Sequence, residues 1–233
     1  MKPISDLDKI LQDGCHLQCE WEGYGLQEVS ITTHQIGELV LTSGTIVPCD
    51  PLIIPDSRYH LKKTIAPGTY PVIVSLASVE AIGEVRFTAA MLRISEAPAV
   101  RWEVAQINEP DENATEDRLY YGVDAGTGCF VDAEAADLIA NLVSLKIRFP
   151  QKDEFDLFCD RVIADMEKNS FGKFSFTGGW SNMKVSDDCE ANMIAFSSGW
   201  GDGGYASFWG YDASGNLTSL VTDFALFPTD EAA

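Results

Sequence analysis

A single helical region lies in the middle of the chain, with β-type sequence on both sides, and this order places the strongest limit on the fold. Asp132 can cap a first helix that runs to about Leu145. A second helix begins after Pro150, where apolar residues follow the i, i+3, i+4, i+7 spacing of one helix face. These are Phe155, Phe158, Cys159, Val162, Ile163 and Met166. Strands and helices do not alternate regularly, so the order predicts an α+β fold with mainly antiparallel sheet, meander or sandwich-like, and two central helices.

The β-type segments are short, apolar or β-branched, and separated by turn residues. Before the helices they cover 37–52, 68–78, 84–94, 99–107 and 118–132. After the helices they cover 173–180, 191–200, 204–212 and 217–227. A short N-terminal helix is expected over 5–13, with Ser5 as its cap. We predict residues 1–37 as this helix and a leading segment, and 38–233 as a single α+β domain that forms one compact unit with it.

The net charge of −20, from 36 acidic and 16 basic residues, restricts the possible partners. An acidic surface repels nucleic-acid phosphates and anionic membranes, and it lacks the basic patch that either would need. It suits solubility, or a protein partner with a basic surface. We therefore expect neither nucleic acid nor a membrane among the partners, and the oligomeric state stays open.

The N-terminal stretch MKPISDLDKILQDG has no apolar core of signal-peptide length, and no apolar run is long enough for a transmembrane helix. Six cysteines without a leader indicate reduced thiols, so we expect a cytoplasmic protein. Only Cys15 and Cys19 are close in sequence, and no second pair follows at the spacing of a zinc site. We expect no metal site and no cofactor.

Two glycine-rich stretches are the most distinctive parts of the chain. The first, YGVDAGTGCFVD (121–132), is similar to the first phosphate motif of the actin and sugar-kinase ATPase fold, where Asp124 would lie near the metal. The chain is too short for the two lobes of that fold, so we interpret this stretch as a glycine hairpin. The second, SSGWGDGGYASFWGYDASGNLTSLVTDF (197–224), does not have the spacing of a calcium loop. We interpret it as strand, glycine corner, strand, turn, strand.

Four aspartates next to glycines or at strand ends are candidate catalytic residues: Asp50, Asp124, Asp202 and Asp223. Carboxylates that converge from different strands can bind a divalent metal or act as acid and base. Aspartate is also common at turns, where it hydrogen-bonds to the backbone without any catalytic role. The first arrangement predicts a metal-dependent hydrolase. The second predicts that the protein is not an enzyme, and this is the interpretation we favour.

Three aromatic residues at and after the glycine corner, Trp200, Tyr205 and Trp209, are candidate ligand-binding residues. Ligand pockets are commonly lined by aromatic side chains with a few polar groups. A sugar or nucleotide binder, with these rings stacked on the ring of the ligand, is therefore a further alternative.

Five segments, taken in order, resemble the successive motifs of the domain-of-unknown-function family 4241. They are SGTIVPCDPL (43–52), APGTYPVIVSLA (66–77), RWEVA (101–105), YGVDAGTGCFVDAEA (121–135) and SGWGDGGYASFWGYDASGNLTSLVTDF (198–224). The resemblance covers about residues 38–227 and implies a single bacterial-type domain. It implies no reaction, and it supplies no catalytic residues.

These features together predict a cytoplasmic, acidic binding or interaction protein without catalysis of its own. One specific form is an immunity-type protein, whose acidic face would suit the basic surface of a toxin or nuclease. The alternatives are the metal-dependent hydrolase and the sugar or nucleotide binder.

Overall fold

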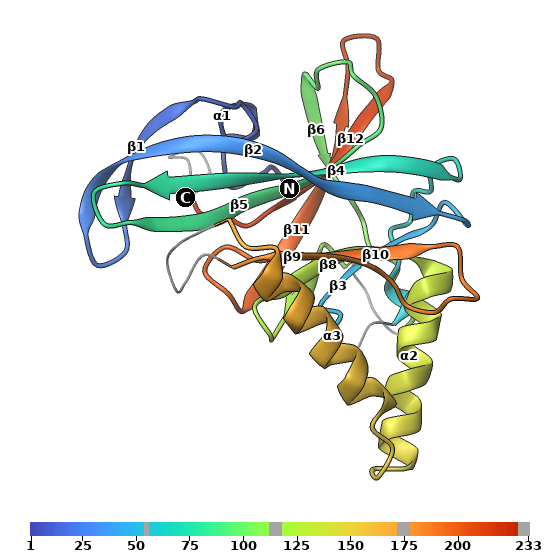
Figure 1. The fold of residues 1–233 in the computed structure, drawn as a ribbon. Coiled ribbons are helices and arrows are strands. Elements are labelled where there is room, and N and C mark those ends of the chain that lie inside the picture. Colours follow the sequence, from blue (N-terminus) through green and yellow to red (C-terminus); the bar gives the residue numbers. More distant parts are fainter. Residues whose placement is uncertain (54–55, 112–117, 172–177, 228–233) are drawn as a thin grey trace.

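Two antiparallel sheets and a pair of helices make up the part of the chain described by a computed structural model, residues 1–53, 56–111, 118–171 and 178–227 (Figure 1). The prediction of an α+β fold with mainly antiparallel sheet is confirmed. The helices follow one another in the middle of the sequence, as predicted, and both lie beside the smaller sheet (Figure 1).

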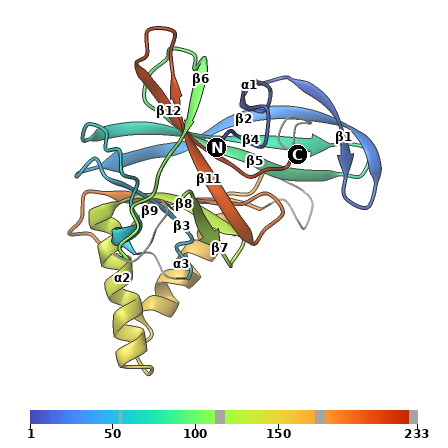
Figure 2. The same cartoon turned by 180° about the vertical axis from the view of Figure 1, so that it is seen from behind.

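The larger sheet is a curved layer of eight strands. Its order is β1 (His16–Trp21), β2 (Gly25–Leu41), β4 (Gly68–Val79), β5 (Glu84–Arg93), β12 (Leu217–Asp223), β11 (Gly203–Tyr211) and β6 (Arg101–Val104). The eighth strand, β7 (Tyr120–Val123), also pairs with β11. The first part of β11 pairs with β7 and the second part with β6, so β11 extends from the upper strands down beside the smaller sheet (Figure 2).

The smaller sheet collects strands from distant parts of the chain. Its order is β3 (Ile46–Cys49), β8 (Thr127–Asp132), β10 (Asn192–Ser197) and β9 (Trp180–Lys184). The chain leaves the larger sheet after β2 through a tight turn at Gly44, which has φ +77°. A Cβ atom at this position would lie 2.1 Å from the backbone oxygen of Ile65, so only glycine fits.

Three α-helices and one 3-10 turn connect or cover these strands. They are α1 (Leu7–Ile10), η1 (Ser57–Tyr59), α2 (Ala133–Arg148) and α3 (Glu154–Lys168). The cap of α2 is Asp132, as predicted, and its side chain accepts from the N–H of Glu134. The prediction of Ser5 as the cap of the first helix is wrong. Asp6 accepts from the N–H of Lys9 instead, and the Ser5 hydroxyl donates to Asp223.

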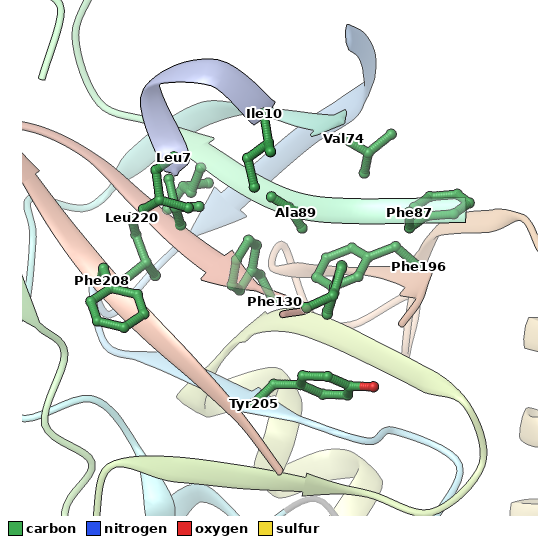
Figure 3. Close-up of a cluster of buried hydrophobic side chains, with 14 of the residues drawn as sticks. Leu7, Ile10, Val74, Phe87, Ala89, Phe130, Phe196, Tyr205, Phe208 and Leu220 are labelled. Atoms are coloured by element: carbon green, nitrogen blue, oxygen red, sulfur yellow. The ribbon is translucent and has the colours of Figure 1, made fainter. Parts of the chain in front are cut away.

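Three strands of the smaller sheet, β3, β8 and β10, are buried on both faces, which explains their mainly apolar sequences, whereas β9 is partly exposed. Phe130 and Phe196 point toward the larger sheet, where Figure 3 shows them among side chains that include Phe208 and Leu220. The alternate residues of the same strands, such as Val131 and Met193, pack against α2 and α3. A strand with two buried faces reads as a continuous apolar run rather than an alternating one.

Two of the expected boundaries can be located along the chain. Residue 37, where the N-terminal segment is divided from the domain, lies inside β2, which pairs with β4 on both sides of that residue. The other is the strand predicted over 173–180. Residues 173–177 lie outside the described part, and β9 begins at Trp180.

Among the described residues, no helix combines the length and the apolar character needed to cross a membrane.

Candidate functional site

The two glycine-rich stretches singled out in the sequence lie side by side. One forms the loop 124–126 between β7 and β8, and the other forms the corner 198–202 between β10 and β11. The N–H of Ser198 donates to the carbonyl oxygen of Gly126 at 3.1 Å. The N–H of Gly126 in turn donates to Oδ1 of Asp202 at 3.0 Å. The fold therefore joins two motifs that are more than seventy residues apart into one structure, which we call the paired glycine loops.

Asp50 fixes the first of these loops, 124–126, by hydrogen bonds to its backbone. Its Oδ2 accepts from the N–H groups of Asp124, at 3.0 Å, and Ala125, at 2.7 Å. Its Oδ1 accepts from the N–H of Leu52 at 3.0 Å. The side chain is only 4% exposed, and burial raises its pKa above the ordinary value, while the three backbone hydrogen bonds act in the opposite direction. Asp50 thus has a clear structural task, which is to fix the loop that follows β7.

The structure brings three of the four candidate aspartates to this region and leaves the fourth elsewhere. Asp50, Asp124 and Asp202 all belong to or contact the paired glycine loops. Asp223 instead accepts from the N–H groups of Ile4 and Ser5, at 2.9 and 2.8 Å, and so ties the N-terminal segment to the end of β12. Within the described residues, no group of three or more His, Cys, Asp or Glu side chains is arranged to hold a metal ion.

The three candidate aromatic residues have different environments. Trp200 is 40% exposed, its ring centroid lies 5.2 Å from that of Trp21, and the guanidinium of Arg86 lies 4.8 Å from its centroid. Tyr205 and Trp209 are buried in the core. The Tyr205 hydroxyl donates to two carbonyl oxygens of the glycine corner, and burial raises its pKa. Of the three rings, Trp200 alone has a substantial surface open to a ligand.

A cleft of about 530 Å³ lies between the paired glycine loops and the last turns of α3. We call it the α3 cleft, and define it by Ala125 and Thr127 on one side, Ile163, Met166 and Glu167 on the helix, and Ser197 on the smaller sheet. Thr127 and Ser197 are register partners across β8 and β10. A smaller hollow of about 150 Å³ shares Ser197 with the cleft and includes Arg86 and Trp200.

Gly179 allows α3 to approach this region closely. A Cβ atom on Gly179 would lie 1.9 Å from the backbone oxygen of Met166, so any other residue would push the helix away. The Ser197 hydroxyl accepts from the N–H of Gly179 at 3.0 Å and fixes the same contact from the side of the sheet. The shape of the cleft therefore depends on glycine backbone as well as on side chains.

The part of the site that α3 contributes is not predicted from the sequence. The apolar spacing places Ile163 on the same helix face as Phe158 and Val162, whereas Ile163 is 44% exposed and lines the cleft. The signal was present in the helical pattern. Phe158 and Val162 lie on the buried side, and Ile163 is rotated by about 100° from Val162. An apolar residue at that angle indicates a surface cleft or an interface.

A family model described as "Protein of unknown function (DUF4241)" matches residues 39–222. The match includes Asp50, both glycine loops and the whole of α3, and it ends one residue before Asp223. No curated protein and no solved structure matches the chain.

Proposed function

Because the chain belongs to the DUF4241 family, whose description names no activity, we propose from its charge and geometry that it is an acidic binding protein without catalysis, whose partner has a basic surface. The family assignment itself gives neither a ligand nor a reaction.

The observation that carries the proposal is the way the candidate carboxylates are used. Asp50 accepts three backbone N–H groups, Asp202 accepts one, and Asp223 accepts three together with the Ser5 hydroxyl. Oxygens that accept backbone hydrogen bonds in this way have fewer lone pairs for a metal or for a proton in transit. These bonds stabilise turns and chain connections, which is the non-catalytic role of aspartate.

The charge of the chain supports a basic partner. A net charge of −20 on a chain of this size produces a field that speeds the approach of cations and basic proteins. Complementary charge contributes mainly to the rate and specificity of association. An immunity-type role, in which the basic partner is a toxin or nuclease, is the finer form of this proposal and rests on the same complementarity.

The test is the charge and salt dependence of binding to a purified partner. Candidate partners are identified by cross-linking in the cells that produce the protein, then purified and titrated over about 0.05 to 0.5 M NaCl. We expect a partner with a basic surface and a Kd that increases steadily with salt. A partner of acidic surface, or a Kd that does not respond to salt, would contradict the proposal.

The hydrolase alternative has its own test. Thermal melting is measured with Mg²⁺, Mn²⁺, Ca²⁺ and Zn²⁺ for the wild type and for Asp202→Asn. A ligand that binds the folded state raises the Tm in a saturable way. We expect no rise that depends on Asp202. A saturable rise in the wild type that Asp202→Asn abolishes would support a metal-dependent enzyme instead.

A further inference from the structure

The walls of the α3 cleft are mostly apolar, and its volume is that of a site for a small ligand. Ligand pockets typically enclose about 300 to 1,000 Å³, and the α3 cleft, at about 530 Å³, falls within this range. Ile163 and Met166 form the wall on the helix, and Leu52 and Ala125 lie opposite. The hydroxyl groups of Thr127 and Ser197 lie at the end of the sheet, where they already bond to backbone groups of the protein.

Among the described residues that line this cleft, one is ionisable, and it is acidic. It is Glu167, exposed on the last turns of α3, and the described part of the wall contains neither Lys nor Arg. Three other hollows in the described part of the chain each include a basic residue, namely Lys9, Arg93 and Arg86. Asp124 is exposed and directly precedes Ala125, which lines the cleft. Asp202 is also exposed and accepts from the N–H of Gly126 in the same loop. The electrostatics of the α3 cleft therefore favour a cation over an anion.

A lysine side chain has the matching chemistry. Its four-carbon stem is apolar and packs along aliphatic surface, while its ammonium group is a compact charge that stays at the edge in water. Arginine recognition commonly uses a bidentate carboxylate or an aromatic ring to stack on, and no aromatic residue is among the described residues that line the cleft. Ile163 and Met166 offer aliphatic surface for the stem, and Glu167 lies at the rim for the charge.

We propose that the α3 cleft is the docking point of the basic partner and receives one of its lysine side chains, with the stem against Ile163 and Met166 and the ammonium group near Glu167. This inference rests on the proposed function, because the lysine belongs to the partner. It adds a specific location and a specific side chain to the general attraction between opposite charges.

The first experiment uses a matched pair of short peptides. One is acetyl-Gly-Lys-Gly-amide, and the other has norleucine, which has the same stem length without the ammonium group, in place of lysine. Binding is followed by NMR of the labelled methyl groups of isoleucine and methionine. We expect saturable shifts at Ile163 and Met166 with the lysine peptide and clearly weaker binding of the norleucine peptide. Equal binding of the two peptides, or no shift at either methyl group, would overturn the inference.

The second experiment compares variants. Glu167→Gln keeps the size of the side chain and removes the charge. We expect this variant to raise the Kd of the lysine peptide by about two- to fivefold, the range of a solvent-exposed ion pair. Ala125→Leu narrows the cleft and should abolish the methyl shifts. The control is Glu190→Gln. Glu190 is exposed and precedes the start of β10, whereas Ser197, which lines the cleft, is at the other end of that strand. Equal effects of the Glu167 and Glu190 variants would show that the cleft has no special role.

The outcomes also separate this inference from the general proposal. If the purified basic partner binds Ala125→Leu with an unchanged Kd and the same salt dependence, the proposed function stands and the docking point is wrong. If the wild type shows no salt-dependent binding to any basic partner, the proposed function fails. In that case methyl shifts with the lysine peptide would show only a cleft for free alkylammonium ions.

Discussion

At the scale of single residues, Asp50 joins parts of the chain more than seventy positions apart through one carboxylate oxygen, Oδ2, which accepts from the N–H groups of Asp124 and Ala125. Its other oxygen, Oδ1, accepts from the N–H of Leu52. In Asp50→Asn, one of the two oxygens becomes an NH2 group that faces a backbone N–H donor. A buried donor left without an acceptor costs about 1–3 kcal/mol, so we expect the free energy of unfolding to fall by about that amount in urea denaturation. Asp202→Asn, with one exposed hydrogen bond, should cost less than about 1 kcal/mol. An Asp50→Asn variant as stable as the wild type would show that the loop is held in another way.

The pH dependence of stability follows from the same residue. Burial raises the pKa of Asp50 in the folded protein above its ordinary value of 3.8. The folded state therefore binds a proton more tightly than the unfolded state does, and the contribution of Asp50 to stability decreases as the pH rises through the interval between these two pKa values. We expect the stability advantage of the wild type over Asp50→Asn, measured by urea denaturation at a series of pH values, to be larger near about pH 4 than near neutral pH. An advantage that grows with pH would mean that the hydrogen bonds outweigh burial.

Cys159 allows a check of burial and charge on α3. Burial, followed by the charges of Asp156 and Asp160, raises the pKa of its thiol to about 11. Only the thiolate reacts with alkylating reagents, so the alkylation rate should still rise about tenfold per pH unit above pH 8, where an ordinary cysteine begins to level off. Asp160→Asn should lower the pKa and speed the reaction at a fixed pH. Peptide mapping by mass spectrometry gives the rate for this one cysteine. A plateau near pH 9 would contradict the expected shift.

At the scale of elements, the two main helices start in different ways. Asp132 is fully buried, caps α2 through the N–H of Glu134, and also accepts from the N–H and hydroxyl of Ser43. Asp153 holds the corresponding position before α3, but its side chain makes no capping hydrogen bond. Asp132→Ala should therefore reduce the free energy of unfolding by at least about 2 kcal/mol, from the lost cap and the unpaired Ser43 groups. Asp153→Ala is the matched control and should change it by less than about 0.5 kcal/mol. Similar losses of unfolding free energy in both variants would mean that the hydrogen bonds of Asp132 do not stabilise the start of α2.

The elements also show where prediction from the sequence succeeds. The helical spacing from Phe155 to Met166 is local, so the presence of α3 after Pro150 could be predicted directly. The division of the strands into two sheets could not, because the chain passes from β2 in the larger sheet to β3 in the smaller one at a turn that depends on contacts with Ile65. Ser5 illustrates the same limit. Its residue type suits a helix cap, but its hydroxyl bonds to Asp223, 218 positions away. The tertiary hydrogen bond to Asp223 therefore outweighs the preference of serine for a helix cap.

The candidate site follows the same division between local and distant information. Both glycine loops were visible as turns, since their glycines and aspartates are typical turn residues. Their hydrogen bonds to one another, through Gly126 and Ser198, depend on the order of strands in the smaller sheet. The contribution of α3 was visible as one apolar residue, Ile163, at an angle away from the buried face. Sequence alone indicates the pieces of this site, and the fold determines that they meet.

At the scale of the whole molecule, the net charge of −20 acts on stability as well as on binding. Like charges repel in the compact state, and this repulsion opposes folding. Added NaCl screens the repulsion, because the Debye length falls to about 8 Å at physiological ionic strength. We therefore expect the Tm to rise with NaCl at neutral pH. Near the isoelectric point of about 4.3 the net charge is small, so the same addition should change the Tm much less.

The comparison of the two pH values separates charge screening from other effects of salt. A general effect of salt on apolar burial would raise the Tm similarly at both pH values, since it acts through surface exclusion rather than through charge. Sucrose serves as an uncharged control at each pH, because it strengthens burial without screening. A rise confined to neutral pH and absent with sucrose would show that self-repulsion limits stability. An acidic surface that weakens its own fold in this way is relieved when a basic partner binds, so the partner should raise the Tm most at low salt. If the bound partner did not raise the Tm more at low salt than at high salt, the proposal of a basic partner would be contradicted.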